Sequence, residues 1–149
     1  MRAVVQRVNQ ASVHVGGREV SRIGFGFLVL LGVEQGDQAE DCTYLVEKIA
    51  GLRVFNDPAG KMNLALQDVE GEVLVVSQFT LLGDCRRGRR PSFVGAAAPE
   101  AGREWYECFA SQLAEKGLTV RRGEFGADMD VTLVNQGPVT LLLDSRKRF

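Results

Sequence analysis

Histidine and cysteine are scarce in this chain, and their scarcity excludes several kinds of site. His14 is the only histidine, so neither a histidine-rich zinc site nor a relay of several histidines can form. The three cysteines, Cys42, Cys85 and Cys108, lie far apart and no C-x-x-C occurs, which excludes a zinc ribbon and a thioredoxin motif. An odd, unpatterned set of cysteines is typical of a reducing compartment. We expect no bound metal and no cofactor.

Long apolar runs and a strong net charge are missing too. The longest apolar run covers residues 25–33 and contains glycine, whereas a helix that crosses a bilayer needs about 20 residues. The first residues, Met1 to Arg7, contain no apolar signal-peptide core. The net charge of −1 excludes a chain that is basic overall, but not a local basic patch. The sequence thus predicts a cytoplasmic protein without a membrane segment.

The composition that is present is typical of one soluble domain. Hydrophobic residues make up 45% of the 149 residues and charged residues 25%. No internal repeat occurs, and no linker rich in proline or serine divides the chain. We predict a single domain over residues 1–149, with a short basic tail at residues 146–149.

The pattern of apolar residues predicts about seven or eight strands and two helices. Gly16-Gly17 suits the two-residue turn of a hairpin. Asp37, with Glu40, is expected to cap the first helix, and Pro99 to begin the second. Because helices follow runs of strands, we predict an α+β fold with a mostly antiparallel sheet. The expected strands cover residues 3–8, 12–15, 18–23, 24–33, 72–77, 120–124, 131–134 and 139–143, and residues 135–138 join the last two.

A polar segment, Ser77-Gln78-Phe79-Thr80-Leu81, follows an apolar strand and precedes a glycine-rich stretch. At the end of a buried strand, hydroxyl and amide groups can face a cleft with fixed geometry. The other interpretation is that these groups satisfy neighbouring backbone atoms, and the spacing alone favours it.

A second segment, Asn135 to Thr140, contains the dipeptide Gly137-Pro138. Glycine permits unusual backbone angles and the close approach of a ligand. An X-Pro bond can be cis, although only about 5–6% of such bonds are cis in folded proteins. The segment is therefore either a plain hairpin turn, which the residues alone favour, or a rigid main-chain wall that recognises a substrate without any side chain.

Four arginines crowd a third segment, Cys85 to Pro91. Arginines separated by glycine suit a flexible loop that contacts phosphates, and a solvated charged surface is the alternative. The four are Arg86, Arg87, Arg89 and Arg90.

The remaining candidates carry weaker signals. Alternation along a strand predicts that His14 is structural or exposed, and helical spacing places Trp105 in the core. Asp128 and Asp130 lack a third ligand, so they predict no metal site.

Taken in order, these segments resemble the D-aminoacyl-tRNA deacylases over almost the whole chain. Each segment alone is short, and the seven together, in this order and spacing, carry the resemblance. They are Met1 to Val8, Ala11 to Val13, Gly51 to Phe55, Gly60 to Asn63, Ser77 to Leu81, Arg90 to Phe93 and Asn135 to Thr140.

The resemblance implies a β-barrel-like α+β fold and an obligate homodimer whose active sites lie at the subunit interface. It also implies hydrolysis of the ester between a D-amino acid and the 3′-terminal adenosine of tRNA, with rejection of L-amino acids. Rejection by a steric wall cannot exclude glycyl-tRNA, because glycine has no side chain. The implied partners are D-aminoacyl-tRNA, contacted at its 3′ end and acceptor stem, and a second copy of the chain.

The resemblance assigns roles to individual residues as well. Gly137-Pro138 resembles a Gly-cisPro dipeptide that projects into the partner subunit's pocket, so we predict that Pro138 is cis. Arg7 resembles the residue that holds this dipeptide in place. The catalytic motif would comprise Ser77, Gln78, Phe79 and Thr80, and the acceptor stem would be gripped by Arg86, Arg87 and Arg89.

The inventory of side chains agrees with catalysis assisted by the RNA. No histidine base stands beside Ser77 or Thr80, which excludes a Ser-His-Asp triad, and no activator of a Thr80 nucleophile is evident. Backbone N–H groups near Phe79 and Thr80 remain as oxyanion donors. The resemblance implies that the substrate's ribose 2′-OH helps to activate water and that Gln78 binds near the adenosine. Two alternatives stay open: a non-catalytic tRNA- or RNA-binding module, and a threonine-nucleophile amidase acting on small D-peptides.

Overall fold

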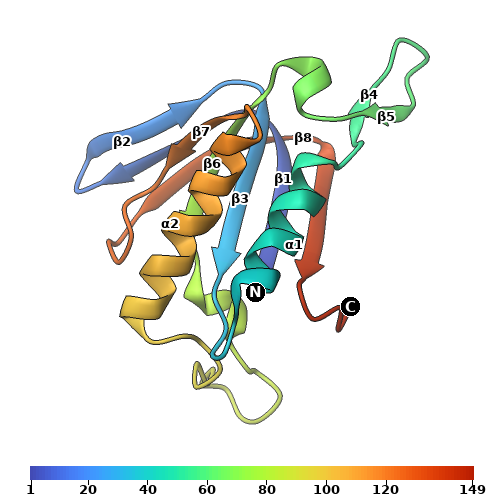
Figure 1. Ribbon diagram of the computed structural model, residues 1–149. Helices are drawn as coiled ribbons and strands as arrows, with labels where there is room; N and C mark the ends of the chain where they lie inside the picture. The colour runs from blue at the N-terminus through green and yellow to red at the C-terminus, as the bar shows by residue number, and fades with distance from the viewer.

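A long strand, β1 (Arg2–Val15), lies at the centre of the computed structural model, which describes residues 1–149. One side of β1 pairs with β8 (Asp130–Asp144). The other side pairs first with β3 (Gly26–Gly32) and then with β2 (Arg18–Ile23), and all three pairings are antiparallel. Because β1 changes partner half-way along, the six-stranded sheet curls toward a barrel (Figure 1).

The rest of the sheet is parallel, so the prediction of a mostly antiparallel sheet is wrong and the sheet is mixed. Strand β6 (Glu72–Ser77) runs parallel to β3, and β7 (Thr119–Arg122) runs parallel to β6. Helix α1 (Ala39–Ala50) lies in the connection before β6, and α2 (Pro99–Glu115) in the connection before β7. Such crossovers bring the chain back in its original direction. The predicted α+β class with two main helices and a barrel-like sheet is confirmed.

The two strands expected at the end of the chain form one strand, β8. Residues 131–134 and 139–143 both pair with β1, in line with each other. Between Asn135 and Thr140, four residues of β8 (136–139) lie opposite the single residue Arg7. The turn-like composition of this segment therefore produces a bulge rather than a reversal of the chain. At the start of the chain, the two expected segments likewise form the single strand β1.

The two helices pack on one face of the sheet and close the main core (Figure 1). Helix α1 begins after Gln38, which forms a capping box with Asp41, so the predicted cap at Asp37 is one residue too early. Helix α2 begins at Pro99, as predicted. The core between helices and sheet contains Phe27, Leu45, Val75, Phe109 and Leu113, with Trp105 packed against it.

Smaller elements complete the fold. Gly16 and Gly17 have φ values of +56° and +78°, which confirms a two-residue turn with positive φ between β1 and β2. A separate hairpin, formed by strands β4 and β5 between residues 55 and 64, projects from the body (Figure 1). No helix has both the length and the apolar character needed to cross a membrane. The remaining elements are β4 (Phe55–Asn56), β5 (Met62–Leu64) and the 3₁₀ helices η1 (Gln67–Val69) and η2 (Phe79–Leu82).

The basic residues at the C-terminus are held against the body by ion pairs. Arg146 lies 3.2 Å from Asp37, and Arg148 lies 2.8 Å from Asp144 and also pairs with Glu34. Burial raises the pKa of Asp144, but hydrogen bonds from Arg148 and from the backbone N–H of Arg146 outweigh it and hold that pKa below its usual range. The guanidinium groups of both arginines are thus engaged within the chain.

Candidate active site

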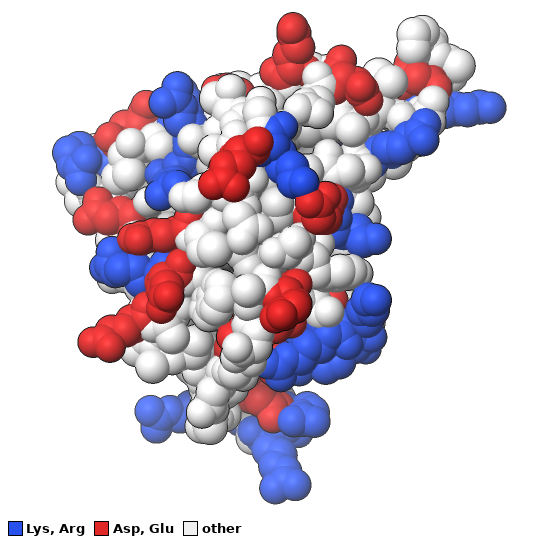
Figure 2. Space-filling model, in the orientation of Figure 1, with Lys and Arg blue, Asp and Glu red and all other residues white.

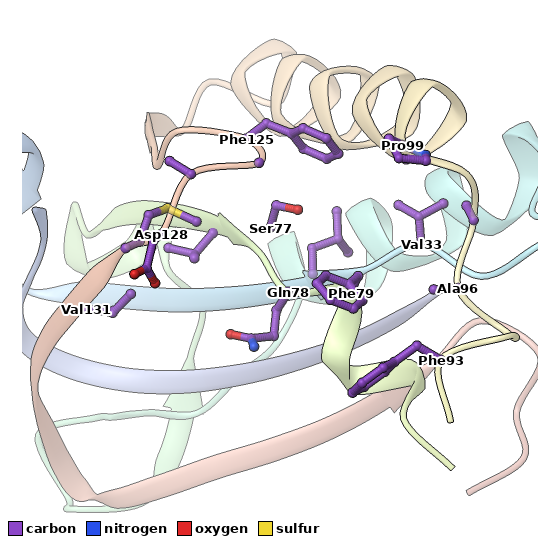
Figure 3. A pocket seen from close by; sticks show the side chains of 17 residues that line it. Val33, Ser77, Gln78, Phe79, Phe93, Ala96, Pro99, Phe125, Asp128 and Val131 are labelled. Carbon is purple, nitrogen blue, oxygen red and sulfur yellow. The ribbon is translucent and has the colours of Figure 1, made fainter. Parts of the chain in front are cut away.

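A pocket of about 610 Å³ opens where strand β6 ends, between the sheet and helix α2 (Figure 3). Most of the residues that line it are hydrophobic. Three of the four predicted catalytic residues, Ser77, Gln78 and Phe79, line this pocket, and Thr80 follows them directly. The structure therefore brings the predicted motif to the mouth of a cavity.

The abrupt end of β6 positions this motif. Residues 73–76 are buried, and the backbone N–H of Gln78 donates the last bond of the strand to Leu31 O at 2.8 Å. The chain then turns into η2, which packs closely on Gly32 of β3. A Cβ at Gly32 would lie 2.6 Å from Leu82 Cδ2 and 3.0 Å from Gln78 O. Glycine at this position is what permits η2 to approach the sheet.

The polar groups of the motif are oriented by one another. The Gln78 carboxamide donates a hydrogen bond to the Thr80 hydroxyl. Phe79 and Thr80 are the first residues of η2, and the first bond along it runs from Leu81 N–H to Gln78 O at 3.1 Å. The N–H groups of Phe79 and Thr80 consequently have no acceptor within the helix and can donate to a ligand.

No histidine or cysteine that could act as a base toward Thr80 lines the pocket. His14, the only histidine, lies in the β1–β2 hairpin, 3.7 Å from Glu19. Neither residue lines the pocket, and no cysteine does. The site can donate hydrogen bonds and exclude water, and the Thr80 hydroxyl is hydrogen-bonded to Gln78 rather than to the one carboxylate of the lining, Asp128.

Arg2 anchors the far end of the motif, and sequence reasoning missed it. Its Nη1 donates to Leu81 O at 3.0 Å, and its Nε donates to Asp144 Oδ2 at 3.3 Å. These partners are 79 and 142 residues away along the chain, so no local pattern could have revealed the contact. The end of the motif is thereby tied to the end of β8.

Aromatic side chains border the pocket on two sides. Phe79 is 57% exposed and packs edge-on against Phe93, with ring centroids 5.2 Å apart. Phe125 forms part of the opposite wall, beside Pro99 (Figure 3). Exposed rings of this kind can stack on a nucleobase. The segment from Phe125 to Met129 also lines the pocket, although no motif marked it.

Arg7 and the bulge of β8 form a second constellation. The Arg7 side chain is buried and donates to Gln136 O at 3.3 Å, to Val54 O at 2.6 Å and to Asn56 Oδ1 at 3.3 Å. The Gly137–Pro138 bond is cis, as predicted, and both residues are exposed.

Gly137 has a φ of +120°, and a Cβ there would lie 2.9 Å from Arg7 Nη2. The bulge therefore needs glycine beside the guanidinium.

One chain does not bring these two constellations together. Neither Gly137, Pro138 nor Arg7 lines the pocket. Arg2, which contacts the first motif, pairs with the end of β8 at Asp144, whereas the bulge lies opposite Arg7, farther along β1. The bulge points outward from an edge strand whose only pairing partner is β1.

The segment from Cys85 to Pro91, called the arginine loop below, borders a separate polar hollow of about 540 Å³. Arg86 donates to the Asp84 carboxylate through Nε and Nη2, at 2.9 and 2.6 Å, and these bonds hold the pKa of Asp84 well below its usual range. Arg87, also in the lining, and Arg89 are exposed and have no carboxylate partner. Figure 2 shows basic side chains at the end of the molecule where this loop projects.

Comparison with known proteins places this chain in a family. The family model described as D-Tyr-tRNA(Tyr) deacylase matches residues 4–144. The chain belongs to the D-aminoacyl-tRNA deacylase family. A "D-aminoacyl-tRNA deacylase" of Thermotoga petrophila is 58% identical, and one of Anaeromyxobacter dehalogenans is 59% identical, each over 149 residues and 100% of both chains. The prediction of the family, and with it of a hydrolase that acts on an ester bond, is confirmed.

Solved structures agree with this fold. The "c-Myc DNA Unwinding Element Binding Protein" superposes with a TM-score of 0.91 at 42% identity, covering 97% of this chain and 98% of the other. A "probable eukaryotic D-amino acid tRNA deacylase" has a TM-score of 0.79 at 20% identity over 96% of this chain and 98% of its own, and shows the same fold.

Proposed function

We propose that this deacylase hydrolyses the ester that joins a D-amino acid to the 3′-terminal adenosine of tRNA and releases free D-amino acid and tRNA. Family membership and the pocket at the end of β6 support the proposal. The apolar lining suits an amino-acid side chain, and the rings of Phe79 and Phe125 suit the adenine base. A cytoplasmic location belongs to the proposal, because charged tRNA is used there.

The chemistry we assign uses water as the nucleophile. The substrate's ribose 2′-OH accepts a proton from water and passes one to the departing 3′ oxygen, while the new C–O bond forms at the carbonyl carbon. The N–H groups of Phe79 and Thr80 stabilise the oxyanion. Ser77, Gln78 and Thr80 position the adenosine and the ester. This arrangement requires no base from the protein, and no histidine lines the pocket.

Rejection of L-amino acids is assigned to the bulge of a second subunit. Gly137-Pro138 would project into the partner's pocket, where an L side chain would meet rigid main-chain atoms, whereas a D side chain and glycine would not. Glycyl-tRNA is therefore a second expected substrate.

A homodimer is supported by the free edge of β8, because an unpaired edge strand offers a surface for pairing. Val134 and Leu142 on this strand are 44% and 62% exposed.

A deacylation assay tests the activity. Purified protein, in the presence of a chelator, should hydrolyse D-Tyr-tRNA and Gly-tRNA and leave L-Tyr-tRNA intact. Binding of the tRNA without hydrolysis would instead indicate an RNA-binding module. Cleavage of small D-peptides without any action on the ester would indicate the amidase.

Mixed dimers test whether the site is shared. In one variant, Ala127→Trp fills the pocket; in the other, Gly137→Ala displaces the dipeptide and is expected to allow hydrolysis of L-Tyr-tRNA. If sites are shared, the one open pocket of a mixed dimer faces the intact dipeptide and hydrolyses only the D-ester. If each subunit has its own complete site, the mixed dimer hydrolyses L-Tyr-tRNA as the Gly137→Ala homodimer does.

A further inference from the structure

Phe93 is an exposed aromatic residue at the rim of the pocket that the proposed function leaves without a role. Its side chain is 38% exposed and lines the pocket next to Phe79. In Figure 3 it lies beyond Phe79, away from the wall that contains Phe125 and Pro99. The rings of Phe79 and Phe125 are assigned to the terminal adenine, so the ring of Phe93 is available to another part of the substrate.

The main chain holds Phe93 in place. Ser92 and Asp84 exchange two backbone hydrogen bonds, at 2.7 and 3.0 Å, and the Ala96 N–H donates to Phe93 O at 3.0 Å. The ring lies close to Gly83, where a Cβ would come within 2.9 Å of Phe93 Cε1. Because the ring is already positioned, little freedom is lost when a flat ligand stacks on it.

The rings of Phe79 and Phe93 face different directions. Their centroids are 5.2 Å apart and their planes are inclined by 72°. Stacking requires two rings to lie nearly parallel with an offset, so a base that lies flat on Phe79 cannot also lie flat on Phe93. The two faces therefore suit two successive bases of a strand that bends between them.

Beyond Phe93 the surface becomes polar. Ser92, the preceding residue, lines the hollow of the arginine loop together with Asp84 and Arg87. The carboxylate of Asp84 is paired with Arg86, which leaves the guanidinium of Arg87 free to bind an anion. The pocket and the hollow thus adjoin at Ser92 and Phe93, where an aromatic face is followed by a site suited to a phosphate.

We propose that Phe93 stacks on the base of the nucleotide that precedes the terminal adenosine, and that Arg87 binds the phosphate on the 5′ side of that nucleotide. The inference rests on the proposed function, which puts the terminal adenosine in the pocket. In tRNA this nucleotide is a cytidine in the single-stranded 3′ end, so its base can leave the stack of the RNA and lie on a protein ring. The enzyme then binds two nucleotides of its substrate, whichever amino acid is attached.

Calorimetry with non-hydrolysable 3′ ends tests the stacking. The first ligand is 3′-deoxy-3′-(D-tyrosylamino)adenosine, in which an amide replaces the ester. The second carries a cytidylate on its 5′ oxygen, and the third carries an abasic ribose phosphate there instead. Phe93→Leu stays apolar but lacks the ring, and Phe93→Tyr keeps the ring. Val94→Ala is the control, at a neighbouring residue that is 83% exposed and lies outside the pocket.

The cytidylate should tighten binding to the wild type about tenfold, the size expected for one stacked base, and the abasic ligand should show little of this gain. Phe93→Leu should lose the gain but bind the adenosine ligand as the wild type does, which also shows that the variant is folded. Phe93→Tyr and Val94→Ala should keep the gain.

The phosphate contact has its own test. A 5′-phosphate added to the cytidylate ligand should tighten binding to the wild type about fivefold more, and less so at high salt. Arg87→Ala should abolish this increment. Arg121→Ala removes the same charge at a residue that lines neither the pocket nor the hollow, and it should leave the increment intact.

The stacking assignment is overturned if the cytidylate brings no gain, if the abasic ligand gains as much, or if the gain survives Phe93→Leu. A phosphate increment that survives Arg87→Ala overturns the second contact. Hydrolysis assays separate this inference from the proposed function. If the wild type hydrolyses no D-aminoacyl ester, the proposed function fails, and the binding of these ligands still decides the role of Phe93. If the ester is hydrolysed and Phe93→Leu keeps the gain, only the inference fails.

Discussion

Arg2 and Arg7 lie on the same strand, and each donates a hydrogen bond to the main chain of one motif, but their surroundings differ. Arg2 reaches Leu81 O at 3.0 Å and is ion-paired with Asp144. Arg7 reaches Gln136 O at 3.3 Å, is only 5% exposed and contacts neutral oxygens alone. Arg2 thus belongs to a network of charges and Arg7 to a set of carbonyl and amide groups.

The difference shows that one strand can hold two segments in place by different interactions, an ion pair at Arg2 and hydrogen bonds to neutral oxygens at Arg7. The motif beside Arg2 lines a pocket, and the ionised Asp144 helps to hold it. The bulge beside Arg7 does not line this pocket and projects into solvent, so it must be rigid before anything packs on it. Four experiments sharpen this contrast or break it.

The largest effect should come from the RNA rather than from the pocket motif. Replacing the 2′-OH of the terminal adenosine by hydrogen should lower the single-turnover rate about 10³-fold, since it removes the group assigned to activate water. Thr80→Ala should cost less than about tenfold, because Thr80 has no neighbouring base and only positions substrate. A loss of about 10⁵-fold in a folded Thr80→Ala protein would instead favour a covalent threonine intermediate.

Asp144→Asn should lower the free energy of unfolding by about 3 kcal/mol at pH 7, since it leaves Arg2 and Arg148 without their shared carboxylate. The folded-state pKa of Asp144 is depressed, so its contribution is present above the unfolded value of about 3.9 and disappears as pH falls through the folded value. Urea unfolding between pH 3 and 7 should show the wild type and the variant converging below about pH 4. Asp130→Asn serves as the exposed control, and a difference that persists in acid would contradict the ion-pair account.

Arg7→Met should lower the free energy of unfolding by about 2 kcal/mol, because it keeps the apolar stem but removes three hydrogen bonds to neutral oxygens. Unlike that of Asp144→Asn, this loss should not change between pH 4 and 7. The ratio of D-Tyr-tRNA to L-Tyr-tRNA hydrolysis should also fall as the bulge loosens. Unchanged rejection of the L-ester would separate Arg7 from chiral discrimination.

The smallest effect should come from the arginine loop, to which neither Arg2 nor Arg7 donates a hydrogen bond. Arg87→Ala combined with Arg89→Ala should raise KM for D-Tyr-tRNA about tenfold and flatten its salt dependence, with little change in kcat. Arg86 is left in place because it is paired with Asp84. Removing Lys61 and Arg121 instead takes away the same charge elsewhere, and an equal shift in that control would mean that the tRNA is held by overall charge.

Local patterns in the sequence were sufficient for much of this molecule. The glycine pair at 16–17, the apolar strand before Ser77 and the helix beginning at Pro99 all occur where the pattern predicted them. Each rests on propensity or turn chemistry within a few residues, which the folded chain leaves intact. The motifs that carry the family resemblance are short segments of the same kind.

Tertiary structure decided the rest, because strand direction and charge pairing depend on partners that are distant in sequence. The apolar run of β6 does not by itself say whether its neighbour is parallel, and only the crossover through α1 settled that. The composition of residues 135–138 suits a turn, and continuous pairing with β1 made it a bulge. Nothing in the sequence distinguishes Arg87 from Arg148. In the folded chain Arg148 lies beside the carboxylate of Asp144 and Arg87 lies beside none, so only the three-dimensional arrangement shows which arginine is free to bind a ligand.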